Sequence, residues 1–400
     1  APMVKVFPLS VITERIEQSL DSIPMGPRNL PSRQRTLIET LKWSSDLLKE
    51  DEKLLFVRLA IFRGGGTLDA VDSICGKDIP ENISKLLSAL VNKNLIMAQE
   101  RVDGEIHFTL LETIRQYNLK QLETSGELDS IAKLHAEYFS HLAEEAEPHF
   151  SGSGQLLWLE KLEIEHDNLR SALAWSLNSE VQADFHLLFT ASLEYCWVLL
   201  NFLSEGRRWL NASLSRPGAA EQTTSRAKAL AAAGHLAYNQ SAYSDVRIVL
   251  EESLSIYRNL GPAGRRGYAN TLITLGDVDT EVGDYDTGSS LMLEALGIMR
   301  ELKDEKGIAR ALWQLGACAV RPGEYEKAGD YFNEALIYLR KQGNGNYTAV
   351  ALSGLAEIAI RQGDYLRAEK LGEESLAIRR EIKENWGSAV SLGHSSWIAL

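Results

Sequence analysis

The tripeptide Gly283-Asp284-Tyr285 returns as Gly323-Glu324-Tyr325 and as Gly363-Asp364-Tyr365, and a weaker copy precedes them as Ser241-Ala242-Tyr243. The tyrosines lie 42, 40 and 40 residues apart. A fixed period in this range is typical of supersecondary units stacked in a row rather than of one closed core. Such an array presents a concave face, so the sequence favours binding over chemistry in this part of the chain.

Other positions recur in step with the tyrosine. A Leu-x-x-x-Gly spacing places both residues on one face of a first helix, and two small residues seven apart share a face of a second helix. The glycine of the tripeptide tolerates left-handed dihedrals, so it can end the first helix. The matching sets are Leu230, Leu272, Leu312 and Leu352; Gly234, Gly276, Gly316 and Ala356; Val246, Gly288, Ala328 and Ala368; and Ser253, Ala295, Ala335 and Ser375.

This pattern resembles the tetratricopeptide repeat, although the period is nearer 40 than the usual 34 or so. The spacing predicts helix pairs near 226–260, 266–303, 307–342 and 347–383. A degenerate pair is predicted at 185–214, with its second helix opening at Glu205. Ser396 falls at the close-approach position of another first helix, so we expect the last repeat to be incomplete. Either the native protein continues beyond Leu400 or another copy covers that end.

The N-terminal third has a different pattern. Its order of helices followed by a hairpin is that of a winged helix. Gly64-Gly65-Gly66 interrupts the helices; it either separates two of them or cradles an anion at the next helix start. The expected elements are helices at 37–48 and 54–61, a helix at 68–74 capped by Thr67, a helix at 83–91 capped by Asn82, and strands at 95–99 and 106–110.

A winged helix raises the possibility of DNA binding, which depends on positive charge. Residues 34–126 contain 12 Lys and Arg against 14 Asp and Glu, and the candidate recognition helix brings only Lys85 and Lys93. Groove-reading helices normally carry several cations for phosphates and bases. The charge therefore favours a packing role, and DNA contact stays the alternative.

Five motifs point to a known family. They resemble the signal-transduction ATPases with numerous domains (STAND), especially bacterial transcriptional regulators and predicted ATPases with tetratricopeptide arms. The resemblance covers nearly the whole chain. The motifs are Arg33-Gln34-Arg35-Thr36-Leu37, Trp43-Ser44 with Leu47-Leu48, Phe62 with Gly64-Gly65, Leu111-Glu112-Thr113-Ile114-Arg115-Gln116-Tyr117 and Glu165-His166-Asp167-Asn168-Leu169-Arg170.

The resemblance implies an NB-ARC-like nucleotide-binding module upstream of the winged helix, with residues 1–32 as the remnant of its helical lid. The only Gly-Lys pair is Gly76-Lys77, which lacks the rest of a phosphate-binding loop. ATP or ADP and Mg²⁺ are therefore expected only in the missing module, with no cofactor and no enzymatic activity in this chain. At the family's Met-His-Asp site stand Leu110, Leu111 and Glu112. We expect Leu111 in the core, and Glu112 with Arg115 against the nucleotide module.

The best candidate binding site is the concave face of the array. Arg321 and Arg361 hold the same position in successive repeats and could together bind carboxylates of a peptide, unless Asp284 and Asp364 neutralise them. The alternative for every candidate is that it is a solvated residue of the groove wall or that it pairs with a residue of a neighbouring repeat. The candidates are Lys228, His235, Tyr238, Asn239, Asn270, Asp277, Glu281, Arg310, Trp313, Arg321, Glu357 and Arg361.

Other classes of site have little support. Glu165-His166-Asp167 could suggest catalysis, but consecutive helical residues point in different directions, so a capping and packing role is favoured. No metal motif is present. The net charge of −13 argues against attraction to nucleic acid or acidic membranes. The three cysteines are expected to be reduced and packed, and the location cytoplasmic.

Taken together, the sequence predicts a mainly α protein: a lid remnant (1–32), a winged-helix domain with a small β-hairpin (33–126), linking helices (127–182) and a tetratricopeptide α-solenoid (183–400). The expected role is the sensor portion of a STAND-type ATPase, with a protein, a peptide or a small-molecule inducer on the array. The chain's own ATPase module is a further partner, and homo-oligomers are possible. The alternatives are a DNA-binding regulator that uses the winged helix and, without motif support, a hydrolase.

Overall fold

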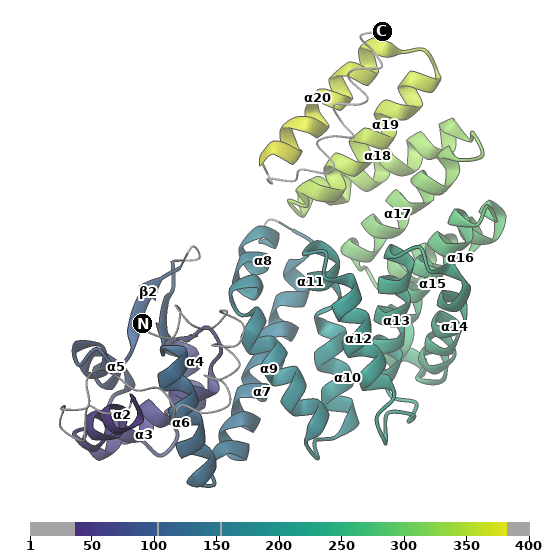
Figure 1. Ribbon diagram of the computed structural model, residues 1–400. Coiled ribbons are helices and arrows are strands. Elements are labelled where there is room, and N and C mark those ends of the chain that lie inside the picture. Colours follow the sequence, from purple (N-terminus) through teal and green to yellow (C-terminus); the bar gives the residue numbers. More distant parts are fainter. Residues whose placement is uncertain (1–36, 102–103, 153, 382–400) are drawn as a thin grey trace, which may run out of the picture. The chain divides into compact units, whose positions relative to one another are not determined.

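The computed structural model describes residues 37–101, 104–152 and 154–381 (Figure 1). The predicted lid remnant, the Arg33 motif and the incomplete last repeat lie wholly or mostly outside these residues. The chain divides into two compact units. Unit 1 comprises residues up to 141 together with 164–178, and unit 2 comprises 142–163 together with 179 onward.

Unit 1 contains the predicted winged helix. Besides its helices it has a three-stranded antiparallel sheet with the strand order β1-β3-β2. Ala98 of β2 and Gly66 of β1 both pair with Phe108 of β3. The elements are α2 (Leu37–Asp46), α3 (Glu50–Arg58), η4 (Leu59–Ile61), β1 (Gly66–Thr67), α4 (Leu68–Cys75), α5 (Ile83–Asn92), β2 (Met97–Glu100), β3 (Ile106–Thr109) and α6 (Glu112–Thr124).

The two predicted caps are confirmed. The Thr67 hydroxyl accepts the Ala70 amide at 3.2 Å, and the Asn82 side chain accepts the Lys85 amide at 3.1 Å. Each oxygen satisfies an amide that the first helical turn leaves without a partner.

The glycine triplet was predicted to be an interruption between helices or an anion cradle, and strand β1 was missed. Gly65 has φ +99°, and a Cβ there would lie 2.9 Å from the Phe108 carbonyl oxygen of β3. A Cβ on Gly66 would lie 2.8 Å from the Phe62 ring. Glycine is therefore needed because the edge strand runs too close to β3 and to Phe62 for a side chain.

The predicted linking region forms α7 (Leu128–Ala146), η5 (Glu147–His149), α8 (Gln155–Ile164) and α9 (His166–Asn178). Residues 164–178, which include α9, belong to unit 1. Asn168 of α9 forms hydrogen bonds with the loop that precedes β1. Its side-chain oxygen accepts the Arg63 amide at 2.7 Å, and its nitrogen donates to the Gly65 carbonyl at 2.9 Å. The same nitrogen donates to the buried Glu165 carboxylate at 2.6 Å. These contacts support the packing role of this motif.

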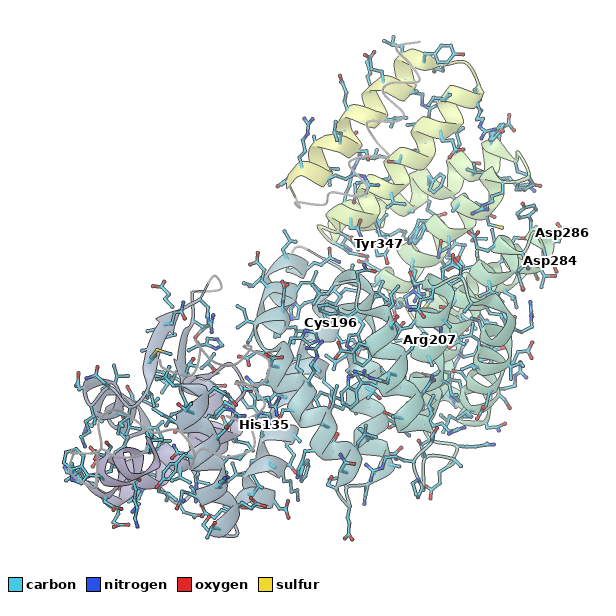
Figure 2. All side chains as sticks on the ribbon, viewed as in Figure 1. His135, Cys196, Arg207, Asp284, Asp286 and Tyr347 are labelled. Atoms are coloured by element: carbon cyan, nitrogen blue, oxygen red, sulfur yellow. The ribbon has the colours of Figure 1, made fainter. Side chains whose placement is uncertain are left out.

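His135 of α7 makes the stability of unit 1 depend on pH. Its ring is buried between Phe62 and Phe139, and burial lowers its pKa from 6.5 to about 4, against a smaller opposing effect of Asn168 (Figure 2). Between pH 6.5 and 4 the unfolded chain binds a proton that the folded chain does not. Stability should therefore fall as the pH falls through this window.

Chemical denaturation at steps from pH 7 to pH 4 measures this slope. The variant His135→Gln should flatten it, whereas His141→Gln, at an exposed position of the same helix, should leave it unchanged. His186 of unit 2 is also buried, and burial lowers its pKa to about 4, so the stability of unit 2 should depend on pH in the same direction. An unaltered slope in His135→Gln would contradict the account.

In unit 2, the structure of residues 185–214 differs from the predicted helix pair. Three helices are present: α10 (Ala183–Ser192), α11 (Glu194–Leu199) and α12 (Leu203–Leu214). Leu193 separates α10 from α11 with dihedrals that remain in the right-handed helical region, whereas Asn201, before α12, has φ +60°. Gly206 of α12 packs on the Trp197 ring, where a Cβ would lie 2.5 Å from a ring carbon.

The four predicted repeats are confirmed as helix pairs (Figure 1). Gly276 and Gly316 mark the close approaches, since a Cβ would lie 2.8 Å from the Gly288 carbonyl and from the Phe332 ring, respectively. The pairs are α13 (Thr224–Asn239) with α14 (Tyr243–Asn259), α15 (Arg265–Glu281) with α16 (Tyr285–Glu301), α17 (Glu305–Val320) with α18 (Tyr325–Lys341), and α19 (Gly345–Arg361) with α20 (Tyr365–Glu381).

Serine replaces alanine at one recurring position of the second helices without leaving a buried hydroxyl unpaired. Ser253 donates to the Ala227 carbonyl and Ser375 to the Ala349 carbonyl, each at 2.8 Å. The same contact thus recurs three repeats apart, and the side chain satisfies its own polar atom.

The three cysteines of the chain are all buried. Cys75, Cys196 and Cys318 are buried and unpaired, and burial raises the pKa of Cys196 to about 12. A thiol held protonated in this way is a poor nucleophile, which fits a packing role.

None of the helices in the described part of the chain combines the length and apolar character that crossing a bilayer requires.

Candidate functional site

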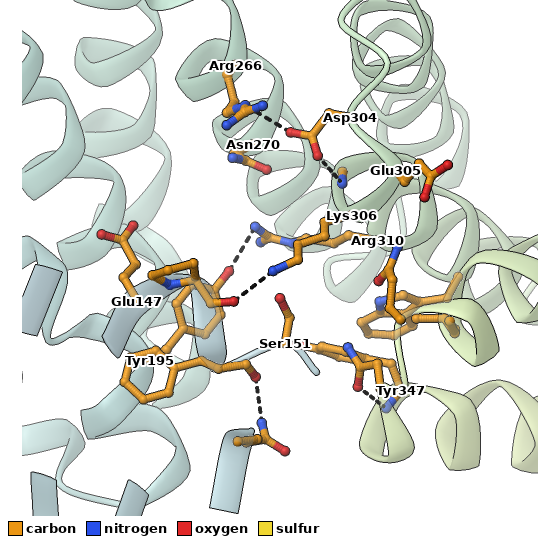
Figure 3. Close-up of a pocket in the computed structure, with 18 of the residues that line it drawn as sticks. Glu147, Ser151, Tyr195, Arg266, Asn270, Asp304, Glu305, Lys306, Arg310 and Tyr347 are labelled. Carbon is orange, nitrogen blue, oxygen red and sulfur yellow. Dashed lines mark hydrogen bonds and ion pairs between the residues drawn. The ribbon is translucent and has the colours of Figure 1, made fainter. Parts of the chain in front are cut away.

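A cavity of about 760 Å³ lies within unit 2, on the first helices of three successive repeats (Figure 3). The opposite side is formed by residues 147–151, Gln155 of α8 and two residues of α11. Its lining residues are Glu147, Pro148, Phe150, Ser151, Gln155, Tyr195, Leu199, Arg266, Asn270, Lys303, Asp304, Glu305, Lys306, Gly307, Arg310, Trp313, Leu339, Gln342, Asn344 and Tyr347.

Segment 147–152 comes from outside the repeats and is held against their first helices. Lys228 of α13 pairs with Glu147 at 2.5 Å, and Lys306 of α17 donates to the Pro148 carbonyl at 2.7 Å. Phe150 is buried, and its carbonyl accepts from Gln155 at 2.7 Å. The concave face is therefore partly occupied by the protein's own chain.

Arg310 of α17 lies in the cavity without a carboxylate partner. Its guanidinium donates to the Tyr195 hydroxyl at 3.1 Å and to the Thr274 hydroxyl at 3.0 Å. Among the described residues no carboxylate oxygen lies within 4.0 Å of it. Other arginines of the array do have such a partner, as Arg226, Arg247, Arg265, Arg266, Arg300, Arg321, Arg340 and Arg361 show.

Two aromatic rings stack beside Arg310. The ring centroids of Trp313 and Tyr347 are 5.2 Å apart with an interplanar angle of 27°. The indole nitrogen of Trp313 is buried and finds no acceptor in the described ranges, and the same holds for the amide nitrogen of Gln342. Unsatisfied buried donors are costly, so their gathering around one cavity favours a bound acceptor.

Of the twelve predicted groove residues, Asn270, Arg310 and Trp313 line the cavity. Lys228 and His235 are engaged with other parts of unit 2, through Glu147 and Glu194. Tyr238 packs against the core, and the exposed Asn239 donates to the His235 carbonyl.

Each arginine of the predicted pair is partly exposed and forms an ion pair in this structure, and a role of the two in binding a ligand stays a prediction. Arg321 pairs with Glu281 of the preceding repeat at 2.5 Å, and Arg361 pairs with Glu357 on its own helix at 3.2 Å. The neutralising residues are thus these glutamates, whereas the suggested aspartates cap helices instead. Asp284 accepts the Thr287 amide and Asp364 the Arg367 amide, each at 3.1 Å.

Asp277 is buried on α15 and accepts a hydrogen bond from Gln314. Burial raises its pKa to about 8, although Arg310 and the Gln314 hydrogen bond act in the opposite direction. Burial thus disfavours the charged form of this carboxyl, and none of its oxygens lies within 4.0 Å of the Arg310 guanidinium, so the two form no ion pair.

At the start of α6 the expectation for Leu111 is wrong. Leu111 is 53% exposed, and Leu110 takes the buried position before the helix. Leu111 is the N-cap residue with extended backbone, which turns its side chain away from the buried face that begins at Ile114. Glu112 and Arg115 pair with each other at 2.8 Å, and Arg115 also donates to the Ala60 carbonyl. The predicted contact of these two residues with a nucleotide module stays a prediction.

The cavity includes several residues that counting along the repeats missed. Tyr195 comes from the irregular segment, and Phe150 from outside any repeat. Lys306 and Tyr347 lie in the first turn of α17 and α19, well before the recurring glycine position from which the groove was counted. A search of the first turns for cations and aromatics would have found Lys306 and Tyr347.

Family models match two parts of the chain. A tetratricopeptide repeat model matches residues 267–341 and 307–381, and a winged helix-turn-helix domain model matches residues 48–123. Both modules are therefore present in this chain, at the places where the fold shows them.

Relatives of known sequence come from mycobacteria. A Mycobacterium tuberculosis protein, described provisionally as an HTH-type transcriptional regulator, is 34% identical over 260 residues, which are 62% of this chain and 29% of the relative. An uncharacterized protein of the same organism is 34% identical over 124 residues, 30% of each chain. The chain thus spans about a third of the length of these relatives.

Solved structures with a similar fold include a STAND protein with a tetratricopeptide repeat sensor from Pyrococcus horikoshii, at 15% identity and a TM-score of 0.43, covering 92% of this chain and 65% of that one. Another is NprR in complex with its cognate peptide NprX, at 18% identity and a TM-score of 0.49, covering 78% of this chain and 82% of that one. The chain joins a winged helix-turn-helix domain to tetratricopeptide repeats, a combination typical of regulatory proteins.

Proposed function

We propose that this chain is the sensor and regulatory portion of a STAND-type signalling ATPase. On this proposal the repeat array binds an inducer, a peptide or a partner protein, and the winged helix passes the event to a nucleotide-binding module outside the chain. ATP or ADP and Mg²⁺ bind in that module, and the present chain turns over no substrate. The relatives extend well beyond the matched region, which leaves room for such a module.

The observation that carries the proposal is the composition of the cavity. One side consists of repeat helices, and the other includes segment 147–152. That segment lies in the stretch 142–163, which is flanked in sequence on both sides by residues of unit 1. A ligand that displaces the segment therefore acts directly on chain that continues into the winged-helix unit.

The test is made on the full-length protein with its nucleotide-binding module. Lys228→Ala combined with Lys306→Ala releases the two contacts of Glu147 and Pro148 with the array. Lys327→Ala combined with Arg340→Ala is the matched control, because these cations form exposed ion pairs with Glu324 and Glu374, which lie outside the cavity. We expect the first pair to change ATP turnover and the mass measured by light scattering with ATP, and the control pair to change neither. Identical behaviour of the two pairs would contradict the relay.

A second candidate is DNA binding by the winged helix, which the description of the mycobacterial relative favours. The charges of the candidate recognition helix argue against it. Lys85 pairs with Glu81 at 3.5 Å, and Lys93 pairs with Glu52 at 2.5 Å, where the Lys93 hydrogen bond lowers the pKa of Glu52. Each cation therefore already has a carboxylate neighbour, which reduces its attraction to phosphates.

We expect no retardation of a mixed-sequence duplex by this chain, even at low salt. Glu52→Gln combined with Glu81→Gln frees both lysines and should raise any residual affinity, with a salt dependence that the original chain lacks. Strong, salt-sensitive binding by the unmodified chain would favour the DNA-binding alternative over the packing role.

A further inference from the structure

We infer that the cavity binds a compact ligand in which a carboxylate is joined to a flat aromatic ring. This inference rests on the proposed sensor function and specifies its ligand. The same chemistry occurs in small aromatic acids and in the C-terminal aromatic residue of a peptide, so the experiment below separates these two sources.

Three cations of the cavity that lack an acidic partner indicate that the ligand carries a carboxylate. Lys306 and Arg310 lie one turn apart on α17 and line the same space (Figure 3). Lys306 contacts a carbonyl and Arg310 two hydroxyls, and neither has a carboxylate partner among the described residues. The Lys303 side chain, just before α17, has no polar partner within the described part of the chain.

The acidic residues of the cavity are already engaged. Glu147 pairs with Lys228, Asp304 with Arg266 at 2.9 Å, and Glu305 with Lys341 at 2.6 Å. The charge left without a counterpart in the cavity is therefore positive, in a chain whose overall charge is −13. The guanidinium of Arg310 is held by Tyr195 and Thr274 through two of its nitrogens, which fixes its plane for a carboxylate before a ligand arrives.

The aromatic ring is assigned from the stacked pair beside these cations. Trp313 follows Arg310 by three residues, so the two side chains lie on one face of α17. Trp313 and Tyr347 stack on each other and both line the cavity together with Arg310, so part of the cavity wall is aromatic. Its indole N–H has no acceptor among the described residues, and a ligand oxygen would provide one.

The size of the ligand follows from the cavity and from segment 147–152. A volume of about 760 Å³ is that of a small-molecule site. The contact between Lys306 and Pro148 crosses the groove beside Arg310, so a long extended peptide cannot run past it while the segment stays in place. A single terminal residue or a free acid fits this space.

Isothermal titration of this chain with indole-3-acetate, indole-3-acetamide and two tripeptides ending in tryptophan, one with a free carboxylate and one amidated, tests the inference. We expect saturable binding of at least one carboxylate form and loss of binding, by about tenfold or more, in the matching amide. Binding of the free acid alone identifies a small molecule as the ligand source, and binding of the tripeptide acid identifies a peptide terminus.

Variants locate the site. Arg310→Lys keeps the charge but removes the planar set of donors, and should weaken binding about tenfold. Trp313→Leu should weaken it comparably. Lys327→Ala, whose ion pair with Glu324 lies outside the cavity, should leave it unchanged. If Arg310→Lys fails to fold, judged by its circular dichroism, Lys306→Met takes its place.

Equal binding of acids and amides would overturn the inference, as would no binding of any probe to the folded chain. This outcome is separate from that of the proposed function. Acid binding without any effect on ATP turnover of the full-length protein would contradict the relay and leave the ligand assignment intact.

Discussion

Replacing Phe332 by alanine should cost about 3–5 kcal/mol, as expected when a buried aromatic side chain is removed from a core. The Phe332 side chain of α18 is 2% exposed and lies between two glycines of neighbouring repeats. A Cβ on Gly316 of α17 would lie 2.8 Å from its ring, and a Cβ on Gly354 of α19 would lie 2.5 Å from it. Neither glycine has a side chain that could move into the space, so the void would remain open.

The loss should be confined to neighbouring helices, because each unit of a repeat array contacts only the next. Hydrogen exchange should show reduced protection in α17, α18 and α19, with little change in α13 and α14. The control is Ile337→Ala on the same helix, whose side chain is 68% exposed. Equal losses in the two variants would show that Phe332 does not fill the space between these repeats.

Replacing Asn168 by alanine should destabilise unit 1 by about 2–4 kcal/mol, because the Arg63 amide and the Gly65 carbonyl would both lose their partner in a buried place. Denaturation followed by hydrogen exchange at β1 and β3 measures the loss. Asn178→Ala is the matched control, since this residue of the same helix is exposed and bonds only the Ala174 carbonyl in the described structure.

A second substitution separates the donor from the acceptor. Asn168→Asp keeps an oxygen for the Arg63 amide but removes the donor to Gly65 and places a second carboxylate against Glu165. Stability should be lower than that of the unmodified chain at pH 7 and should recover in part as the pH falls, because protonating one carboxyl of the pair relieves the repulsion. A pH-independent loss would contradict this account of the site.

The repeats could be predicted because their constraint is local and periodic. Gly276 and Gly316 are small since a helix crosses there, and that requirement returns every 40 residues. Strand β1 could not be predicted in this way, because Gly66 and Thr67 form a strand only through pairing with residues some 40 positions away. The break at Leu193 could not be predicted either, because residues 189–197 contain neither glycine nor proline.

The candidate site was predictable in part for the same reason. Counting outward from the recurring glycine found Arg310 and Trp313, which share a helix face. The remaining side of the cavity comes from segment 147–152, which follows no repeat. Its contact with Lys306 joins residues 158 positions apart. No periodicity connects two such places, so the sequence predicted a groove formed by the repeats alone, where the structure has a cavity that segment 147–152 bounds on one side.

The two contacts of segment 147–152 also bear on the elasticity of the array. A stack that touches only nearest neighbours lengthens under tension by small rotations at each interface. Here the adjacent residues Glu147 and Pro148 bind Lys228 of α13 and Lys306 of α17, so these two helices, two repeats apart, are linked through a single short piece of chain. Tension between them acts first on that link. We therefore expect the first half of the array to be stiffer than the second, where the described residues include no such connection.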